Sequence, residues 1–296
     1  MAFEELTVSQ LTTDLADRGY IADRGLATSL LLSLKLGKPL LLEGEVGVGK
    51  TELARTVSAM LGRDLIRLQC YEGIDMHQAL YEWDYARQML FVRSLDTDNA
   101  SDEQLFGPRF LLERPLLQAV RSGDQCVLLI DEIDKADIEF PNDLLLELDR
   151  MEFHVYETKQ TIVARQRPIM IITSNNEKEL PDAFLRRCFF HYIRFPDTET
   201  MQQIVDVHYP VIQKRLVSQA LSLFYELRDA PGLKKKPSTS EFLDWLKLLM
   251  VEDIPLEALR SENTRDLIPP LHGALLKNEQ DVHLLERMAF LNRQGR

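Results

Sequence analysis

Cysteines are few in this chain, and long hydrophobic runs are missing. The 296 residues include three cysteines, Cys70, Cys126 and Cys188, which lie far apart without paired spacing. This pattern argues against a zinc site or a disulfide framework, so we expect reduced, mostly buried thiols. No uninterrupted apolar run approaches the roughly 18 residues of a membrane span, and Glu4 and Glu5 stand where a secretory signal needs basic residues. The expected location is the cytoplasm.

Positive charge is also in short supply. The chain has 35 Lys and Arg against 47 Asp and Glu, a formal net charge of -12 at pH 7. This balance disfavours a broad contact with a phosphate backbone, so nucleic acid is the less favoured partner. With 45% hydrophobic residues the chain can bury a sizeable core. Its length and pattern predict two domains, residues 1–196 and 197–296.

The run GEVGVGKT lies between a strand-like stretch and a helix-like one, 39–42 and 52–61. Its glycines let the backbone curl so that N–H groups point at phosphate oxygens, at the positive end of the following helix. In loops with this spacing the lysine reaches the β and γ phosphates, and the threonine hydroxyl holds magnesium. We therefore expect ATP and Mg²⁺ to bind here, with nucleotide contacts from Gly44, Glu45, Val46, Gly47, Val48, Gly49, Lys50, Thr51 and Glu52.

Further strand candidates alternate with helical segments along the first domain. They span residues 64–69, 127–131, 169–173 and 189–195. Such alternation predicts a mostly parallel sheet covered by helices on both faces.

Two segments break the alternation, and a helical region follows. Residues 71–95 interleave aromatic and charged residues and look like an insertion, whereas residues 152–164 alternate as a β-hairpin with a polar tip. After Pro196 the pattern predicts helices at 199–209, 212–228 and 241–250. Ser238, followed by Glu241, matches a capping box at the start of the last of these.

Polar residues follow two of the predicted strands. Asp131 ends one strand, where its carboxylate can hold the magnesium that Thr51 also contacts, and Glu132 can polarise an attacking water. Asn175 follows the next strand and can orient the same water. Each has a plainer interpretation, because adjacent acids are common at solvated strand ends and asparagine favours turns. The glycine-rich run upstream favours the catalytic interpretation.

Arg186 and Arg187 precede the last predicted strand. An arginine is always charged and can stabilise the transition state of phosphoryl transfer, commonly from a neighbouring subunit. A salt-bridged surface pair is the alternative.

The order of GEVGVGKT, VLLIDE, ITSNN and LPDAFLRRC resembles that of the AAA+ ATPases, and within them the MoxR group. The runs RLQCYEGID, YEWDY and KKKPSTSEFLDWL are similar to the CoxD-like branch. The resemblance extends from about Tyr20 to the end of the chain. It implies an α/β P-loop AAA+ domain with a five-stranded parallel sheet in the order 5-1-4-3-2, a C-terminal all-α lid domain, and a ring that is usually a hexamer.

The resemblance assigns roles to single residues. GEVGVGKT takes the place of Walker A, Asp131 and Glu132 that of Walker B, and Asn175 that of sensor 1. Arg187 takes the arginine-finger position, although the doubled arginine leaves the choice between Arg187 and Arg186 open.

Two other matches are looser. Ser240 stands where many members have a sensor 2 arginine, and the run Lys234, Lys235 and Lys236 just before it can supply a substitute cation. Tyr20 and Ile21 match the place where such ATPases contact adenine.

The function implied is an ATP-hydrolysing chaperone that remodels a client metalloenzyme during cofactor assembly, as for the molybdenum-copper centre of carbon monoxide dehydrogenase. A von Willebrand factor A domain protein is the implied partner. An AAA+ nucleic-acid motor or loader is the alternative, and a P-loop small-molecule kinase is a third reading. Free phosphate as product indicates hydrolysis, whereas a phosphorylated metabolite indicates transfer.

Overall fold

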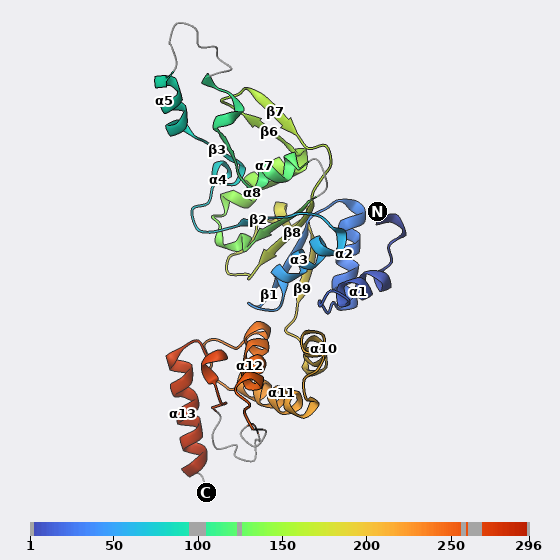
Figure 1. The fold of residues 1–296 in the computed structure, drawn as a ribbon, viewed down its shortest axis with the longest axis vertical. Coiled ribbons are helices and arrows are strands. Elements are labelled where there is room, and N and C mark those ends of the chain that lie inside the picture. Colours follow the sequence, from blue (N-terminus) through green and yellow to red (C-terminus); the bar gives the residue numbers. More distant parts are fainter. Residues whose placement is uncertain (1–2, 95–104, 123–125, 256–258, 260–267, 295–296) are drawn as a thin grey trace. The chain divides into compact units, whose positions relative to one another are not determined.

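The computed structural model describes residues 3–94, 105–122, 126–255, 259 and 268–294 (Figure 1). The chain forms two compact units. The first unit comprises Met1–Arg18, Ala22–Gly44 and Lys50–Ile193, and the second comprises Gly19–Ile21, Glu45–Gly49 and Arg194–Arg296.

A five-stranded parallel sheet forms the centre of the first unit. From edge to edge it runs β2-β5-β8-β1-β9. Four short strands elsewhere in the chain shift these labels. Counted within the sheet alone, the order is 2-3-4-1-5, which is the expected 5-1-4-3-2 read from the opposite edge. The bounds are β1 Leu40–Gly44, β2 Leu65–Gln69, β5 Val127–Asp131, β8 Ile169–Ser174 and β9 Phe189–Ile193.

The strands have the composition that their places in the sheet require. Every residue of the central strands β5 and β8 is buried, as continuous apolar runs predict for strands covered on both faces. Strand β9, at an edge, alternates between exposed and half-buried residues. The expected strands are all confirmed to within two residues; the largest differences are that β1 runs on to Gly44 instead of ending at Leu42, and that β9 ends at Ile193 instead of Phe195.

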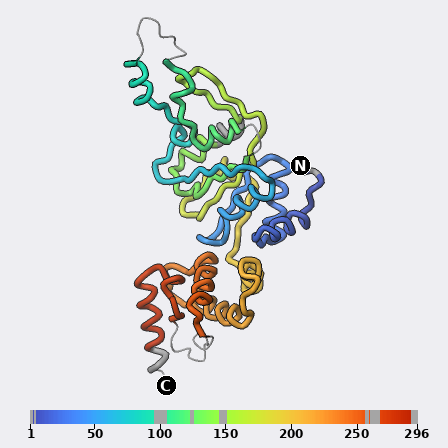
Figure 2. The backbone as a smooth tube through the Cα atoms, viewed as in Figure 1, coloured from blue at the N-terminus to red at the C-terminus, as the bar shows by residue number. Residues whose placement is uncertain are grey.

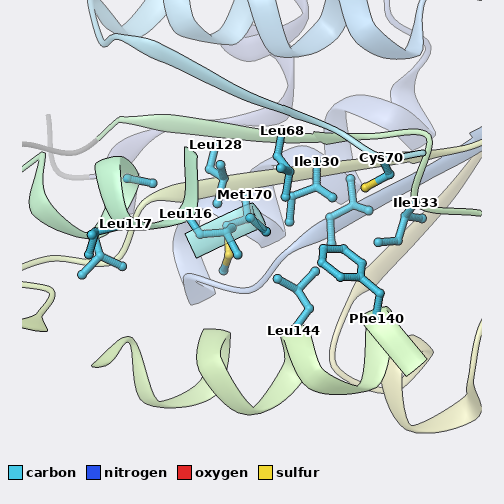
Figure 3. Close-up of a cluster of buried hydrophobic side chains, with 14 of the residues drawn as sticks. Leu68, Cys70, Leu116, Leu117, Leu128, Ile130, Ile133, Phe140, Leu144 and Met170 are labelled. Carbon is cyan, nitrogen blue, oxygen red and sulfur yellow. The ribbon is translucent and has the colours of Figure 1, made fainter. Parts of the chain in front are cut away.

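Helices cover both faces of this sheet. Helix α3 contacts β1 and β5. On the other face, Phe140 and Leu144 of α8 point towards strand residues such as Ile130 (Figure 3). The helical segments are η1 Phe3–Glu5, α1 Val8–Ala16, α2 Arg24–Leu36, α3 Lys50–Leu61, α7 Pro115–Arg121, η3 Ile133–Lys135, α8 Glu139–Arg150 and α9 Asp182–Leu185.

The cysteines are free thiols, two of them buried and Cys188 half-buried. Burial raises the pKa of Cys70 and that of Cys188 to about 12. These thiols therefore stay protonated at neutral pH, as expected for structural cysteines.

The segment predicted as an insertion forms a small substructure joined to the hairpin. Strand β3 pairs antiparallel with β4, so the substructure continues past residue 95. The Tyr81 hydroxyl donates to the Glu157 carboxylate at 3.1 Å and accepts the Tyr156 N–H at 3.3 Å. Tyr85 also donates to Glu157, at 3.4 Å. The elements are α4 Met76–Leu80, β3 Tyr81–Trp83, α5 Tyr85–Ser94, η2 Pro108–Phe110 and β4 Leu111–Glu113.

The predicted hairpin is confirmed. Strands β6 (Glu152–Val155) and β7 (Gln160–Val163) pair antiparallel, and Phe153 and Val155 are buried in the core of the first unit. This alternate burial is why the sequence shows a period of two.

The second unit is helical, and its path is followed in Figure 2. Phe224 of α11 and Phe242 of α12 pack in its core as a tilted ring pair, with ring centroids 4.5 Å apart and an interplanar angle of 44°. Ser238 and Glu241 form the predicted capping box at the start of α12. The elements are α10 Thr198–His208, α11 Lys214–Arg228, α12 Thr239–Val251, η6 His272–Ala274 and α13 Glu279–Gln294.

A buried carboxylate holds the lysine run in place. Asp281 of α13 is 1% exposed and accepts the backbone N–H groups of Lys234 at 2.8 Å and Lys235 at 3.1 Å. The three lysine side chains are exposed. Their backbone is therefore fixed while their charges face solvent.

Within the described ranges, no helix combines the length and the apolarity needed to cross a membrane.

Candidate functional site

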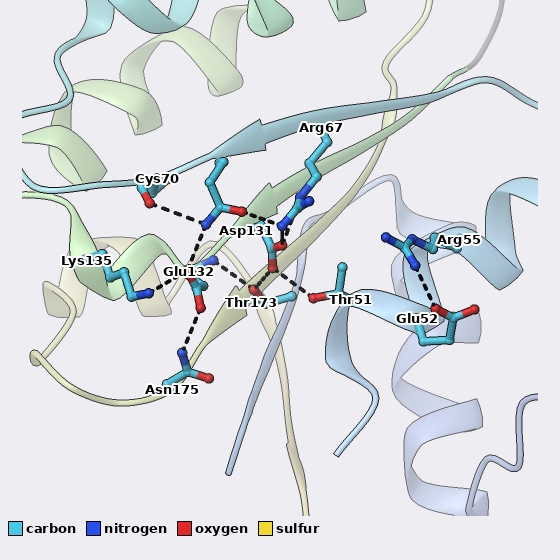
Figure 4. A network of polar contacts seen from close by, with 11 residues as sticks. Thr51, Glu52, Arg55, Arg67, Cys70, Asp131, Glu132, Lys135, Thr173 and Asn175 are labelled. Atoms are coloured by element: carbon cyan, nitrogen blue, oxygen red, sulfur yellow. Dashed lines mark hydrogen bonds and ion pairs between the residues drawn. The ribbon is translucent and has the colours of Figure 1, made fainter. Parts of the chain in front are cut away.

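The carboxyl ends of neighbouring parallel strands bring polar residues together in the first unit. Gln69 ends β2, Asp131 ends β5, and Asn175 follows β8. Parallel strands end at one edge of a sheet, where ligands bind in open α/β folds. Figure 4 shows the resulting network of polar contacts.

Asp131 accepts more hydrogen bonds than the other side chains of this network. It is 2% exposed, and its Oδ1 accepts hydrogen bonds from the hydroxyls of Thr51 at 3.1 Å and Thr173 at 2.5 Å. Its Oδ2 accepts from Arg67, from Nε at 3.0 Å and from Nη2 at 2.5 Å. A carboxylate has about four lone-pair sites, so these four donors use its whole capacity.

Glu132 is held in an unusual backbone conformation. Its φ of 56° and ψ of 51° lie in the left-handed region, which is sparsely populated by residues other than glycine. Its N–H donates to the Thr173 hydroxyl at 2.9 Å, which links it to the neighbouring strand. Strain of this kind, held by surrounding contacts, is typical of functional positions.

Three donors orient the Glu132 carboxylate. Oε2 accepts from Gln69 Nε2 at 2.8 Å and from Lys135 Nζ at 2.7 Å, and Oε1 accepts from Asn175 Nδ2 at 3.4 Å. The structure thus brings Asn175 and Glu132 together. The contact with Glu132 also raises the pKa of Lys135, so that ammonium stays charged.

Lys50 is buried in an acidic surrounding. It is 7% exposed, and its ammonium donates to the Gly44 carbonyl at 2.6 Å. Burial lowers its pKa, and nearby carboxylates, first Asp134 and then Asp131, oppose that shift. Burial also raises the pKa of Glu43, with repulsion from Asp134 adding to the effect.

Asp134 fixes the backbone that follows β8. It is 1% exposed, and its Oδ2 accepts the N–H groups of Asn175 at 3.1 Å and Glu177 at 2.9 Å. This pair of bonds sets the position of the Asn175 side chain.

The donor set suits the magnesium that the sequence implies. Carboxylates and a hydroxyl are hard oxygen ligands, and Mg²⁺ is bound in proteins through one or two carboxylates. Thr51 and Asp131 are joined by a hydrogen bond, and the Asp131 carboxylate is desolvated. These two residues fit the roles expected of them.

The loop 45–49 groups with the second unit, and its glycines allow close approach there. Gly47 has a φ of 78°, and a Cβ at this position would lie 2.3 Å from Ser238 Cβ and 3.5 Å from Ser240 Oγ. Glycine is therefore required on two grounds, conformation and space. Ser240 accordingly lies next to this loop.

Tyr20 packs on the same loop. A Cβ at Gly49, which has a φ of 95°, would lie 3.4 Å from Tyr20 Cε2, and Tyr20 is 8% exposed. Ile21, the other residue matched to adenine contact, is half-buried. The ring of Tyr20 thus supports the loop backbone.

Arg228, a residue that the motifs did not indicate, contacts Glu45 of this loop. Arg228 is 6% exposed, forms an ion pair with Glu45 and donates to the Pro237 carbonyl at 2.6 Å. Its guanidinium lies 3.3 Å from the centroid of the Phe195 ring.

Two other residues expected to contact nucleotide are exposed. Val46 is 63% exposed, and Glu52 is exposed and forms an ion pair with Arg55.

Arg186 and Arg187 lie elsewhere in the first unit. They are exposed and line a cavity with Gly37, Lys38 and Pro39, which precede β1. This is the amino edge of the sheet, opposite the edge that carries Asp131. The structure therefore does not bring either arginine to Asp131 or Glu132 of its own chain.

The motifs also missed Arg67, Gln69, Thr173 and Lys135. Arg67 and Gln69 are two residues apart on β2, so their side chains share one face of the strand. That alternation is visible in the sequence, but nothing in it shows which strand lies beside β2. Thr173 ends a run of apolar residues and gives no signal of its own.

Comparison with known proteins gives the family. The family described as AAA domain, dynein-related subfamily, matches residues 39–188, about half of the chain. The chain belongs to this family. The match covers the run GEVGVGKT, both acids at the end of β5, Asn175 and the arginine pair.

Curated relatives of this AAA protein match over shorter stretches. An uncharacterized protein of Staphylococcus saprophyticus is 31% identical over 107 residues, which cover 36% of this chain and 34% of the relative. An uncharacterized protein of Staphylococcus haemolyticus is 29% identical over 104 residues, covering 35% and 34%. The chain thus spans about a third of the length of these relatives.

Proposed function

We propose that this AAA protein hydrolyses ATP with Mg²⁺ and uses the energy to remodel a client protein, as a chaperone of the MoxR type. The observation that carries the proposal is the placement of Glu132. Its carboxylate lies beside the buried Asp131 and against the Asn175 amide, at the edge of the sheet where the Walker A lysine is buried.

The residues divide the chemistry of phosphoryl transfer among them. Glu132 acts as the general base that polarises the attacking water, and Asn175 fixes the direction of the base. Lys50 neutralises charge on the phosphates from a desolvated position, where its interaction is stronger than in water. Thr51 and Asp131 hold magnesium, which when bound supplies charge stabilisation to the phosphates.

The position of the arginine pair supports assembly into a ring, which we propose to be a hexamer. Arg186 and Arg187 lie at the opposite edge from Asp131, so either can serve as a finger only for a neighbouring copy. Helices α10 to α13 act as the lid domain in this proposal. The client as a metalloenzyme, the von Willebrand factor A partner and the cytoplasmic location rest on the resemblance to the MoxR group.

Substitution of Glu132 by Gln tests the proposal. The variant keeps the shape of the side chain but removes the base. Affinity for ATP should stay within about threefold, while the rate of phosphate release should fall by about 100-fold or more. Binding is measured with a fluorescent ATP analogue, and turnover by phosphate release.

The matched control is Glu139→Gln, an exposed acid in the first turn of α8. Its turnover should equal that of the wild type. A Glu132→Gln variant that hydrolyses ATP at the normal rate would remove Glu132 from the mechanism, and a wild type that binds no ATP would overturn the proposed function.

A further inference from the structure

The guanidinium of Arg67 places a permanent positive charge beside the Asp131 carboxylate, which is expected to bind magnesium. Its Nε and Nη2 both donate to Asp131 Oδ2, at 3.0 and 2.5 Å. The Asp131 side chain is 3% exposed, whereas that of Arg67 is 46% exposed. Asp131 is therefore held within the sheet, whereas the side chain of Arg67 has room to move towards solvent.

The other two donors to Asp131 are compatible with a bound metal. The Thr51 hydroxyl can offer its oxygen lone pair to a cation while its hydrogen still points at Asp131 Oδ1. Thr173 lies in the interior of β8, is 1% exposed, and its hydroxyl also accepts the Glu132 N–H. Neither bond has to break when a metal binds.

Oδ2 is different, because Arg67 occupies both of its lone-pair sites. A magnesium ion, or a water bound to it, needs at least one of these sites. The guanidinium and the metal also repel each other, since both are cations next to a carboxylate in a partly desolvated place. Metal binding therefore has to loosen the contact between Arg67 and Asp131.

We propose that Arg67 is an internal counter-cation that competes with Mg²⁺ for Asp131, and so limits how much magnesium adds to nucleotide affinity. The inference rests on the proposed function. Arg67 does not touch the phosphates in this account; it acts through Asp131 as a positioning residue.

Arg67 is also connected to Glu132, the proposed general base, through Gln69. Arg67 also donates from Nη2 to Gln69 Oε1, and Gln69 Nε2 donates to Glu132 at 2.8 Å. If the Arg67 guanidinium moves away from Asp131, it also disturbs Gln69, whose side chain holds Glu132. A metal bound to Asp131 would therefore also act on Glu132, through these two residues of β2.

The test measures binding, not turnover. For each protein, the Kd of a fluorescent non-hydrolysable ATP analogue is measured in EDTA and in saturating Mg²⁺, and the ratio of the two gives the coupling between metal and nucleotide. Arg67→Gln keeps a polar side chain but removes the charge. Its ratio should exceed that of the wild type by about tenfold, as expected for the loss of a charge-assisted contact.

Arg114→Gln is the control. Arg114 forms an ion pair with Glu82 at 2.7 Å, and its side chain is 44% exposed, close to the value for Arg67. It does not contact Asp131, so its ratio should equal that of the wild type. Arg67→Met serves as a second neutral variant in case the glutamine variant folds poorly.

An unchanged or lower ratio in the neutral variants would overturn the inference, because Arg67 would then merely orient Asp131. Folding of both variants is monitored by circular dichroism. If neither variant folds, the inference is also overturned, and Arg67 has a structural role. If the wild type binds the ATP analogue neither in EDTA nor in Mg²⁺, the proposed function would be refuted instead.

Discussion

At the residue scale, the site depends on a few backbone positions that tolerate little change. Gly47 combines a positive φ with a space that Ser238 closes off, and Glu132 accepts a left-handed conformation without being glycine. The motif predicts the first of these from its spacing. The second follows from the Thr173 hydroxyl that holds the Glu132 N–H, a contact across two strands.

Replacement of Gly47 by Ala should weaken ATP binding by at least about tenfold, because the loop must shift to relieve both the strained φ and the contact with Ser238. Isothermal titration calorimetry measures the loss. Gly37→Ala is the control, since Gly37 also has a positive φ, 60°, but a Cβ there would meet nothing within 4 Å. Equal losses in the two variants would show that the loss does not arise from the loop.

Some of the residues that the sequence predicted for the site lie where a strand ends. Asp131 and Asn175 were found because an apolar run stops there. Arg67 and Arg228 were not, because each reaches its partner through a long side chain across 64 and 183 residues of sequence. Sequence reasoning locates the ends of strands, but pairs of this kind need the order of the sheet or the packing of the helices.

At the element scale, elements with a local signal were predicted and those made by distant pairing were not. The start of α12 follows from Ser238 and Glu241, which satisfy each other's backbone N–H groups. Strands β3 and β4 have three residues each and lie about thirty residues apart, so no period could reveal their pairing. Helix α13 was also missed, and its role became visible through Asp281, which binds the lysine run.

Loss of the cap on α12 should lower the stability of the second unit. Ser238→Ala leaves the Glu241 N–H without its acceptor and should cost about 1 kcal/mol, or about 4 °C in Tm. Thermal unfolding followed by circular dichroism gives the value. Ser222→Ala, on the exposed side of α11, should change Tm by less than about 1 °C; a similar drop in both would argue against the cap.

At the scale of the whole molecule, the sheet separates two kinds of charge. The carboxyl edge carries Asp131 and Glu132, and the amino edge carries Arg186 and Arg187. Within one copy the two groups lie at opposite edges, which is the reason that we propose a site shared between copies. The parallel direction of the strands assigns the two groups to opposite edges, because the acids lie at the carboxyl end of β5 and the arginines precede β9.

Mixing experiments test the shared site. Arg187→Ala should reduce ATPase activity by about 1000-fold, the order found for arginine fingers, and so should Lys50→Ala. Mixed in equal amounts, the two inactive variants should regain part of the activity, because some interfaces then pair an intact Lys50 with an intact Arg187. Arg186→Ala, treated in the same way, decides which arginine is used, and no recovery in any mixture would exclude a finger acting between copies.

The contacts of Glu157 have a mechanical consequence. The carboxylate at the hairpin tip accepts from Tyr81, which opens β3, and from Tyr85, which opens α5. These hydrogen bonds join the tip of the β6–β7 hairpin to the start of β3 and of α5. Movement of either segment alone would expose Tyr81, which is 6% accessible. A force applied at the hairpin tip would therefore be passed through these hydrogen bonds to β3 and α5.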